Sequence, residues 1–496
     1  MSKKQSLSSQ LISGILASVL IASSPATAAT KNDKLEPLQD GIAAWASWVE
    51  HQSIIKGITS VSIGVVQDDQ LIYSKSFGYA NPDKRLVASP DTLYSVCSIS
   101  KLFTAVSIMK LRDEGKLRLD DPVSKYVPEG KLSSKFPDAP IPTIRSLLTH
   151  SSGLAREPTF SFWDLESNPF PMEAQIKKDM ASSEMLYPPH NFYEYSNLGY
   201  AMLGMIIKET SGESFQDYVQ QQIFDPLGME NSYADAPWSL HGNQLAVGYT
   251  TKLRDGMRKP FKPFKTNDYA SVAGVFTNVK DMAKFLGWQL RLRQAQVDGK
   301  KLKQILSPHT LAEMQQVHFA DASLKRSRGL GFSVYKVGAK TVYGHSGLCP
   351  GYVTNVSIEP SSGLGLIVFT NQVDAPVYNI QKQGYQFIWG AMKAKADPSE
   401  AGAIKDLEFK KYTGVYESGL GQSYYGPWKG KLIGFDLSRS SPSDSFELFR
   451  PIGDHKFQRI RDDSKIPGEV AVFRNFDRSG KALETVTYNY LMKRVD

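Results

Sequence analysis

The sequence predicts an α+β domain followed by a small all-β domain, and two patterns support this. Over about the first 390 residues, segments with apolar residues at helical spacing alternate with short β-favouring runs, which indicates helices around an antiparallel sheet. Beyond residue 406, short segments of alternating polarity follow one another at regular spacing, which is typical of a small β-sandwich or barrel. A chain of 496 residues is long enough for two such domains.

The first half of the chain begins with helical spacing over residues 35–51. Two β-favouring runs, 60–66 and 70–77, flank turn residues and predict a hairpin. An apolar helical pattern then runs from residue 98 to about Gly115, and a short helix closed by polar turn residues is expected within 140–154. Loop-favouring residues then continue up to Tyr195, and Pro188-Pro189 excludes a helix within this segment.

Helical spacing returns over residues 197–223, and Asn278 with Asp281 forms a cap-like start for a further helix. Four strand-like runs follow before a closing helix expected over residues 378–393; they occupy 331–335, 341–343, 351–358 and 364–369. A linker is expected at 396–406, which separates a first domain (29–395) from a tail domain (407–496). Six strands are expected within the tail, at 412–416, 432–437, 446–449, 457–460, 470–473 and 483–488.

Residues 1–28 have the pattern of a cleaved signal peptide. Lys3 and Lys4 precede an apolar stretch from Leu11 to Ala22, and a small-residue cleavage pattern ends at Ala28. No cysteine follows this stretch to carry a lipid anchor, and no later apolar run is long enough to span a bilayer. We therefore expect a periplasmic or secreted protein without a membrane anchor after signal cleavage.

The charge balance does not indicate a charged macromolecular partner. The formal net charge is +8, and loss of the signal peptide, with its two lysines, lowers it to +6. The densest basic segment, residues 252–265, is expected to be a solvated loop, with attraction of acidic substrates as the alternative. Nucleic-acid binding is not expected, because interleaved aromatics and a recognisable module are lacking. No metal or cofactor is expected either, since no zinc motif, cysteine cluster or Gly-rich phosphate loop occurs.

Cys97 and Cys349 are the two cysteines of the chain. Each lies beside a stretch that we consider catalytic, and an oxidising compartment would permit a bridge between them. A disulfide requires two Cα atoms within about 7 Å, which a sequence cannot establish. Two buried free thiols are therefore the expected state, with a disulfide as the alternative.

The strongest nucleophile candidate is Ser98. A serine in the first turn of a buried helix lies where the helix dipole favours developing negative charge. Lys101, three residues further, shares its face of the helix, and a lysine in apolar surroundings can lose its proton and then deprotonate a serine hydroxyl.

The Ser-x-x-Lys pattern is not specific by itself, because it occurs at Ser98/Lys101, Ser107/Lys110 and Ser333/Lys336. Ser107 lies nine positions after Ser98, about half a turn out of phase on the same helix. The third pair lies in a predicted strand, where residues three apart point to opposite faces. Helix geometry therefore selects Ser98.

Two further motifs offer polar groups for a substrate. Tyr195-Ser-Asn197 precedes a helix, where the phenol can relay a proton and the amide can hold a carbonyl. Taken alone, however, the pattern is better explained by an N-cap with a packed tyrosine. His345-Ser346-Gly347 lies on or beside a strand, and His345 alone could be a structural histidine; His150 is expected to be structural. Residues 344–348 nearly match a Gly-x-Ser-x-Gly nucleophile elbow, but the fifth position is leucine and strands follow, so this interpretation fails.

These segments occur together and in order: Ser98-Ile-Ser-Lys101, residues 147–154 (LLTHSSGL), Tyr195-Ser-Asn197 and His345-Ser-Gly347. As a set they resemble the serine β-lactamase and penicillin-recognising hydrolase superfamily. The most similar branch contains class C β-lactamases, D-aminopeptidases, D-alanyl-D-alanine carboxypeptidases and related esterases. The resemblance covers about residues 40–395 and implies the β-lactamase/transpeptidase fold. The tail, from residues 412–416, is similar to the lipocalin-like barrels that follow some members.

The resemblance implies an acyl-enzyme mechanism in which Ser98 attacks a carbonyl, with Lys101 and Tyr195 sharing base and acid duty. Asn197 would position the substrate amide, and the backbone N–H groups of Ser98 and Leu348 would form the oxyanion hole. Where the family often has Lys-Thr-Gly or Lys-Ser-Gly, this chain has His345-Ser346-Gly347. A titratable imidazole would thus replace the usual cation, which argues against an efficient β-lactamase, while Ser346 would still offer a hydroxyl to a substrate carboxylate.

The sequence therefore predicts an exported serine hydrolase that cleaves peptide or peptide-like amide bonds through a covalent acyl-enzyme. Its expected partners are small peptide, ester or β-lactam-like substrates. A carboxylesterase or weak β-lactamase is the first alternative, since pockets rather than motifs determine the acyl substrate. A penicillin-binding sensor or a non-catalytic module is the second. The oligomeric state cannot be inferred from the sequence.

Overall fold

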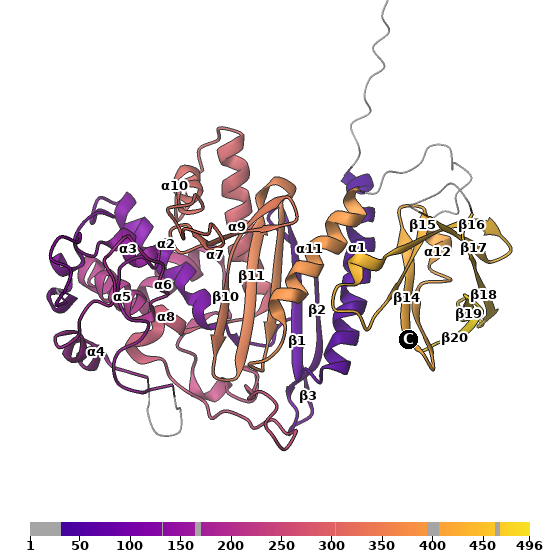
Figure 1. The fold of residues 1–496 in the computed structure, drawn as a ribbon, viewed down its shortest axis with the longest axis horizontal. Coiled ribbons are helices and arrows are strands. Elements are labelled where there is room, and N and C mark those ends of the chain that lie inside the picture. The colour runs from indigo at the N-terminus through magenta and orange to yellow at the C-terminus, as the bar shows by residue number, and fades with distance from the viewer. Residues whose placement is uncertain (1–30, 131, 164–169, 303, 394–405, 462–466) are drawn as a thin grey trace, which may run out of the picture.

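A computed structural model describes residues 31–130, 132–163, 170–302, 304–393, 406–461 and 467–496. The predicted signal peptide, residues 1–28, and nearly all of the predicted linker, residues 396–406, lie outside these ranges. Within them, a layered part with helices on both faces of an antiparallel sheet is followed by a closed β-barrel (Figure 1). The predicted α+β class with an all-β tail is thereby confirmed.

The central sheet has nine antiparallel strands in the order β3-β2-β1-β12-β11-β10-β9-β8-β7. Its strands are β1 (Ser60–Gln67), β2 (Gln70–Asn81), β3 (Leu86–Val87), β7 (Phe319–Ala320), β8 (Ser327–Arg328), β9 (Ser333–Val337), β10 (Lys340–Cys349), β11 (Tyr352–Glu359) and β12 (Leu364–Thr370). β1 pairs with β12, for example Val61 with Thr370, so chain segments about 300 residues apart meet at the centre. Both strands are buried almost throughout, because helices cover both faces. Six of these strands correspond to predicted runs, whereas β3, β7 and β8 were missed because two-residue strands give no sequence signal.

The helices of the layered part are α1 (Lys31–Ile55), α2 (Ser100–Asp113), α3 (Ile144–Leu148), α4 (Glu173–Met180), α5 (Asn197–Ser211), α6 (Phe215–Val219), α7 (Asp225–Leu227), α8 (Ala270–Ala273), α9 (Val279–Val297), α10 (Pro308–Met314) and α11 (Val377–Lys393). α1 and α11 cover one face of the sheet, and the other helices lie on the opposite side (Figure 1). Asn278 caps α9 by accepting a hydrogen bond from Asp281 N, as predicted. No helix within the described ranges is both long and apolar enough to cross a bilayer.

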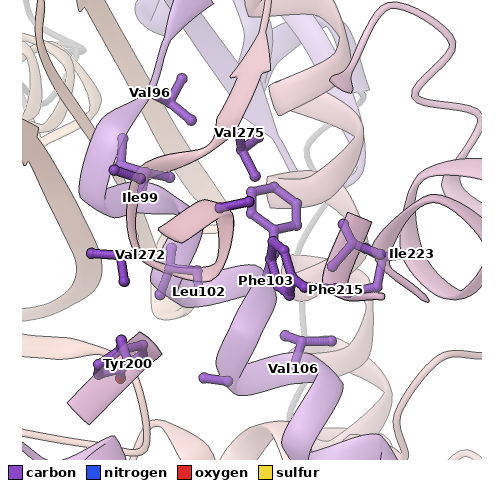
Figure 2. Packing of buried hydrophobic residues seen from close by; sticks show 14 of the residues in the cluster. Val96, Ile99, Leu102, Phe103, Val106, Tyr200, Phe215, Ile223, Val272 and Val275 are labelled. Atoms are coloured by element: carbon purple, nitrogen blue, oxygen red, sulfur yellow. The ribbon is translucent and has the colours of Figure 1, made fainter. Parts of the chain in front are cut away.

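α2 passes through the middle of the helical layer and is buried on nearly all sides. Its apolar side chains pack against residues from several other elements (Figure 2). Phe103 stacks on Phe285 with ring centroids 4.3 Å apart and meets Phe224 edge to face at 5.4 Å. Such dense packing restricts movement of α2 and therefore fixes the groups at its N-terminal end.

The tail forms a closed eight-stranded barrel, one strand after another. Its elements are α12 (Asp406–Phe409), β13 (Gly414–Ser418), β14 (Gly421–Trp428), β15 (Lys431–Asp436), β16 (Glu447–Gly453), β17 (Lys456–Ile460), β18 (Val470–Phe476), β19 (Ala482–Thr487) and β20 (Tyr490–Arg494). The outer face of β14 and β15 packs on α1 and α11 and shares one apolar core with them. Trp48 Nε1 donates a hydrogen bond to Arg439 O at 2.9 Å across this contact. The barrel therefore lies on the side of the sheet away from α2 (Figure 1).

Candidate active site

Ser98 lies in a tight turn that a short second sheet holds in place. The turn follows β4 (Tyr94–Ser95), which pairs with β6 (Val275–Thr277), and β6 also pairs with β5 (Tyr233–Ala234). Cys97 adopts the left-handed conformation with φ of 52°, and a 3₁₀ turn over Cys97–Ile99 leads directly into α2. Ser100 Oγ stabilises this turn, because it donates to Cys97 O at 2.6 Å and accepts from Val275 N at 2.9 Å. A left-handed non-glycine residue carries backbone strain, which the surrounding structure must hold in place.

A disulfide joins Cys97 to Cys349, with their Cα atoms 5.6 Å apart. The expectation of two free thiols was therefore wrong. β10 crosses beside the Ser98 turn, which brings together two cysteines separated by 252 positions. The proximity depends on this crossing, which local sequence patterns do not show.

Lys101 is fully buried, and its amine lies within hydrogen-bond distance of Ser98. Lys101 Nζ is 3.1 Å from Ser98 Oγ and 3.0 Å from Val272 O. It forms no ion pair with a carboxylate among the described residues. Burial holds the Lys101 pKa well below the usual lysine range. The negative charge of Glu157 offsets this lowering only in part. A neutral amine beside a serine hydroxyl can accept the hydroxyl proton.

Tyr195 lies next to the same pair, with Lys101 Nζ 5.1 Å from the centre of its ring. Burial raises the pKa of its phenol, and the neighbouring Ser98 hydroxyl opposes part of this rise. Tyr195 is thus a neutral hydroxyl at neutral pH. His150 packs against its ring at 4.2 Å and accepts a hydrogen bond from Ser196 N at 3.1 Å, so His150 supports the Tyr195 segment as a structural residue.

Asn197 begins α5, and its amide is oriented by a carboxylate that the sequence did not indicate. Asn197 Nδ2 donates to Glu157 Oε1 at 2.5 Å, and Tyr269 OH donates to Glu157 Oε2 at 2.7 Å. Because carboxylate oxygens accept hydrogen bonds, the amide nitrogen faces Glu157. Asn197 Oδ1 is then left buried, with no hydrogen-bond partner among the described residues.

The motif His345-Ser346-Gly347 lies on the part of β10 that is not paired with β9. β9 pairs with residues 340–344 of β10, so the edge at His345–Cys349 faces the Ser98 turn instead. Ser346 and Leu348 are exposed and line the cavity described below, while Gly347 between them is buried against the Ser98 turn. A Cβ at Gly347 would lie only 2.1 Å from Val96 O. Gly347 therefore permits close contact between β10 and the turn, and it is not among the residues that line the cavity.

His345 is neutral at physiological pH, which differs from the expected titratable imidazole. Burial, together with the nearby charge of Arg328, lowers the His345 pKa to about 3. Its Nδ1 lies 2.6 Å from Ser346 O. Because a carbonyl oxygen only accepts, Nδ1 carries the proton and Nε2 keeps a free lone pair, buried and without a partner among the described residues. His345 thus supplies an acceptor and no positive charge.

A cavity of about 410 Å³ lies between the Ser98 turn, the Tyr195 segment and the exposed edge of β10. It brings together five predicted residues: Ser98, Tyr195, His345, Ser346 and Leu348. Lys101 and Asn197 are buried and are not part of its lining, although Lys101 contacts Ser98. Six lining residues were not predicted: Arg156, Tyr193, Glu194, Arg326, Arg328 and Ser333. None of the basic residues at 252–265 lines it.

The other Ser-x-x-Lys pairs have different surroundings. Ser107 Oγ donates to Phe103 O within α2, and Lys110 pairs with Glu114. Ser333 and Lys336 lie on β9, where Lys336 Nζ donates to Thr341 Oγ1 at 2.7 Å. No group of three or more metal-ligating side chains suited to a metal ion occurs among the described residues.

Comparison with known proteins identifies the relatives of this arrangement. The family model described as "Beta-lactamase" matches residues 45–386. Beta-lactamase-like protein 2 of Dictyostelium discoideum is 30% identical over 262 residues, which are 51% of this chain and 46% of that protein. The chain spans about half the length of the curated relatives it matches.

Several solved structures share the fold, and two of them illustrate the likeness. The octameric penicillin-binding protein homologue from Pyrococcus abyssi is 24% identical with a TM-score of 0.62, and the match covers 91% of this chain and 99% of that one. The D-amino acid amidase from Ochrobactrum anthropi, solved with D-phenylalanine, is 21% identical with a TM-score of 0.58, over 71% of this chain and 99% of that one. Such likeness concerns the fold alone.

Proposed function

Because the chain belongs to the beta-lactamase family of serine hydrolases, which act on amides, esters or β-lactams, we propose that it cleaves peptide or peptide-like amide bonds through an acyl-enzyme at Ser98. The single observation that carries this proposal is the contact between Ser98 Oγ and the fully buried Lys101 Nζ. The contact supplies a nucleophile and a neutral base within 3.1 Å. No other serine–lysine pair of the three has this arrangement.

Acylation follows from the positions of these groups. Ser98 Oγ bonds to the substrate carbonyl carbon while its proton passes to Lys101 Nζ. The backbone N–H groups of Ser98 and Leu348 stabilise the oxyanion. When the C–N bond breaks, the leaving nitrogen takes a proton through the neutral Tyr195 hydroxyl, which regains one from Lys101. Water then attacks the acyl carbon of the Ser98 ester. The bond from this carbon to Ser98 Oγ breaks, Oγ takes up a proton from the water, and the acyl group leaves as a carboxylic acid.

An amide rather than an ester is favoured by Asn197. With Nδ2 held by Glu157, the free Oδ1 is a buried acceptor that requires a donor. Asn197 does not line the cavity, so a substrate would reach Oδ1 only by displacing the side chains that cover it. A peptide would then supply an N–H donor, which a simple ester lacks, and an unpaired buried acceptor costs binding energy. The D-amino acid amidase of the same fold acts on an amide, which agrees with this proposal.

The test compares Ser98→Ala with Ser107→Ala, a matched serine on α2, the helix that follows the Ser98 turn. Mature protein is incubated with D- and L-peptides, short-chain p-nitrophenyl esters and a chromogenic cephalosporin, and products and intact protein mass are followed. We expect peptide cleavage and an acyl adduct in wild type and Ser107→Ala, and neither in Ser98→Ala. Cleavage of esters alone would favour the carboxylesterase, and a stable adduct without turnover would favour the penicillin-binding sensor. Equal activity of Ser98→Ala and wild type would exclude the mechanism.

Export is a separate proposal, supported by the pattern of residues 1–28. Expression of the full chain with recovery of the periplasmic and external fractions tests it. We expect an N-terminus at Ala29 in those fractions. Retention of Met1 in the cytoplasm would contradict it.

A further inference from the structure

The tail barrel has a cavity of its own, with a volume of about 320 Å³. Its lining residues come from the turns between β13 and β14, between β15 and β16 and between β19 and β20, and from the adjoining strand ends. Because consecutive strands of the barrel are antiparallel, these three turns lie at the same end. We call this cavity the barrel cup. Its volume is at the lower end of the range for small-molecule sites, roughly 300–1,000 Å³.

Aromatic rings fill the barrel below the cup. The Phe473 ring lies 5.6 Å from the Tyr416 ring and 5.5 Å from the Tyr425 ring, measured between centroids, and 5.5 Å from the Phe457 ring. Tyr425 belongs both to this packed core and to the lining of the cup, so it forms the floor. The cup therefore ends at Tyr425, and a long apolar chain has no room to continue along the barrel axis.

The charged side chains that line the cup already have partners of opposite charge. Arg439 Nε lies 3.8 Å from Asp436 Oδ2. Glu447 Oε1 lies 3.2 Å from a guanidinium nitrogen of Arg459, and it accepts a hydrogen bond from Tyr488 OH at 2.7 Å. Among the described residues that line the cup, Asp436 and Glu447 are the acidic ones and Arg439 is the basic one. The cup is therefore suited to a polar ligand without net charge.

The rim of the cup combines exposed aromatic rings with hydroxyl and amide groups. Tyr490 is 54% exposed and Tyr488 is 38% exposed. Tyr490 and Met492 are alternate residues of β20 and share its inner face, so the Tyr490 ring stands at the mouth above the floor. The face of an aromatic ring carries partial negative charge and attracts C–H groups. Hydroxyl and amide side chains that donate and accept hydrogen bonds complete the lining: Ser418, Gln422, Ser423 and Ser445.

A sugar ring has both matching properties, because it presents C–H groups on its faces and hydroxyl groups around its edge. We propose that the barrel cup binds a neutral saccharide, either as a free sugar or as a unit of a glycan chain. This second function does not depend on Ser98, since the cup and the Ser98 cavity share none of the described residues that line them. A saccharide held by the tail would keep the catalytic domain close to substrates that are attached to a glycan.

The test measures saccharide binding by the mature protein with both domains present. The protein is titrated calorimetrically with maltose, cellobiose and N,N′-diacetylchitobiose, and with 1-octanol as a neutral apolar probe. Cosedimentation with insoluble cellulose and chitin separates glycan chains from free sugars. The measurements are repeated with Tyr490→Ala, Tyr490→Phe and Arg439→Met. Tyr378→Ala is the matched control, because Tyr378 is also 54% exposed but lies on α11, outside the cup.

We expect at least one of the saccharides to bind. Tyr490→Ala should weaken that binding about 3- to 10-fold through loss of the aromatic face, and Arg439→Met should weaken it by a similar factor through loss of hydrogen-bond donors. Tyr490→Phe should keep most of the affinity, and Tyr378→Ala should keep all of it. Added salt should have little effect on a ligand without charge. Circular dichroism and thermal unfolding verify that each variant is folded.

Cosedimentation would assign the cup to glycan chains, and binding of the disaccharides alone would assign it to free sugars; both results support the inference. Three outcomes would overturn it: no binding of any saccharide or polymer, binding of 1-octanol alone, or saccharide binding that Tyr490→Ala and Arg439→Met leave unchanged. Failure of the hydrolase proposal would look different, because Ser98→Ala and wild type would then share the same lack of peptide cleavage while saccharide binding persisted in both.

Discussion

Cys97 is bonded to Cys349, and the two cysteines directly neighbour Ser98 and Leu348. These neighbours are the residues whose backbone N–H groups we propose as the oxyanion hole. A single covalent link, with Cα atoms 5.6 Å apart, therefore ties the turn before α2 to the edge of β10 at the point where both meet the substrate. Preorganised donors stabilise a transition state only if their spacing is fixed.

Replacing both cysteines, as Cys97→Ala with Cys349→Ala, should lower kcat more than it raises KM. The substrate would still find its cavity, but the two backbone donors would be less well positioned. We also expect the free energy of unfolding to fall by about 2–4 kcal/mol, since the bridge closes a long loop. Steady-state kinetics and urea unfolding measure the two effects. Reductant should reproduce them in wild type and change nothing in the double variant; unchanged kcat in that variant would contradict the positioning role.

Lys101→Met should abolish most activity without unfolding the protein. Methionine fills a similar volume in the buried site but cannot accept the Ser98 proton. We expect kcat/KM on the best peptide substrate to fall about 100- to 10,000-fold. Lys336→Met, in the strand-borne Ser-x-x-Lys pair, is the matched control and should remain active. If Lys101→Met keeps wild-type activity with an unchanged fold, another group is the base.

Glu157→Gln should change both the pH profile and the efficiency of the reaction. Glu157 is the carboxylate that raises the Lys101 pKa, so its neutralisation lowers that pKa further. The base is then free at lower pH, and the acid limb of kcat/KM shifts to lower pH. Glutamine also offers both donor and acceptor atoms to Asn197, whose orientation is no longer fixed, so kcat/KM at the plateau should fall about tenfold.

Glu194→Gln is the matched control for this profile. Glu194 lines the cavity but is not among the groups that shift the Lys101 pKa. Its neutralisation should leave the acid limb in place. An unshifted limb in Glu157→Gln, or an equal shift in both variants, would show that the Lys101 pKa does not govern this limb.

The sequence was sufficient for features that depend on local periodicity. Helical phase separates Ser98 from Ser107, and the structure indeed places the Ser107 hydroxyl on Phe103 O within the helix. Strand alternation likewise located β10 and β11. Two barrel strands were missed, β14 and β20. β14 contains Gly421, Gly426 and Pro427, and β20 follows a turn in which Tyr488 and Asn489 are both left-handed.

Features that depend on contacts between distant segments could not be predicted. Arg328 meets Tyr193 across 135 positions, and Glu157 meets Tyr269 across 112. Arg326 and Arg328 both lie outside residues 252–265, the densest basic segment, which was the one charge signal in the sequence. The close pair Arg326-Ser-Arg328 before a strand could have suggested two arginines near the same wall. Which cavity these two arginines line, however, depends on the path of β8 and β9 in the folded chain.

Acid should destabilise the protein before its carboxylates titrate, because two histidines are buried in neutral form. The His345 pKa is about 3 in the folded chain and about 6.5 when unfolded, and burial also lowers the His150 pKa. Between these values the unfolded chain binds the additional proton, so stability decreases as pH falls from about 6.5 toward 3. Each such histidine contributes a slope of about 1.4 kcal/mol per pH unit near pH 5.

His345→Gln should therefore reduce the pH dependence of unfolding by about one proton. Urea unfolding at pH 5.0, 5.5, 6.0 and 7.0 measures the slope in wild type and variant, because carboxylates contribute little above about pH 5. His309→Gln, at an exposed histidine, is the matched control and should leave the wild-type slope nearly unchanged. A wild-type slope in His345→Gln would mean that His345 already binds a proton in the folded protein. That result would restore a titratable positive charge to the motif His345-Ser346-Gly347. The imidazolium of His345 would then add to the positive charge of Arg328 at the cavity.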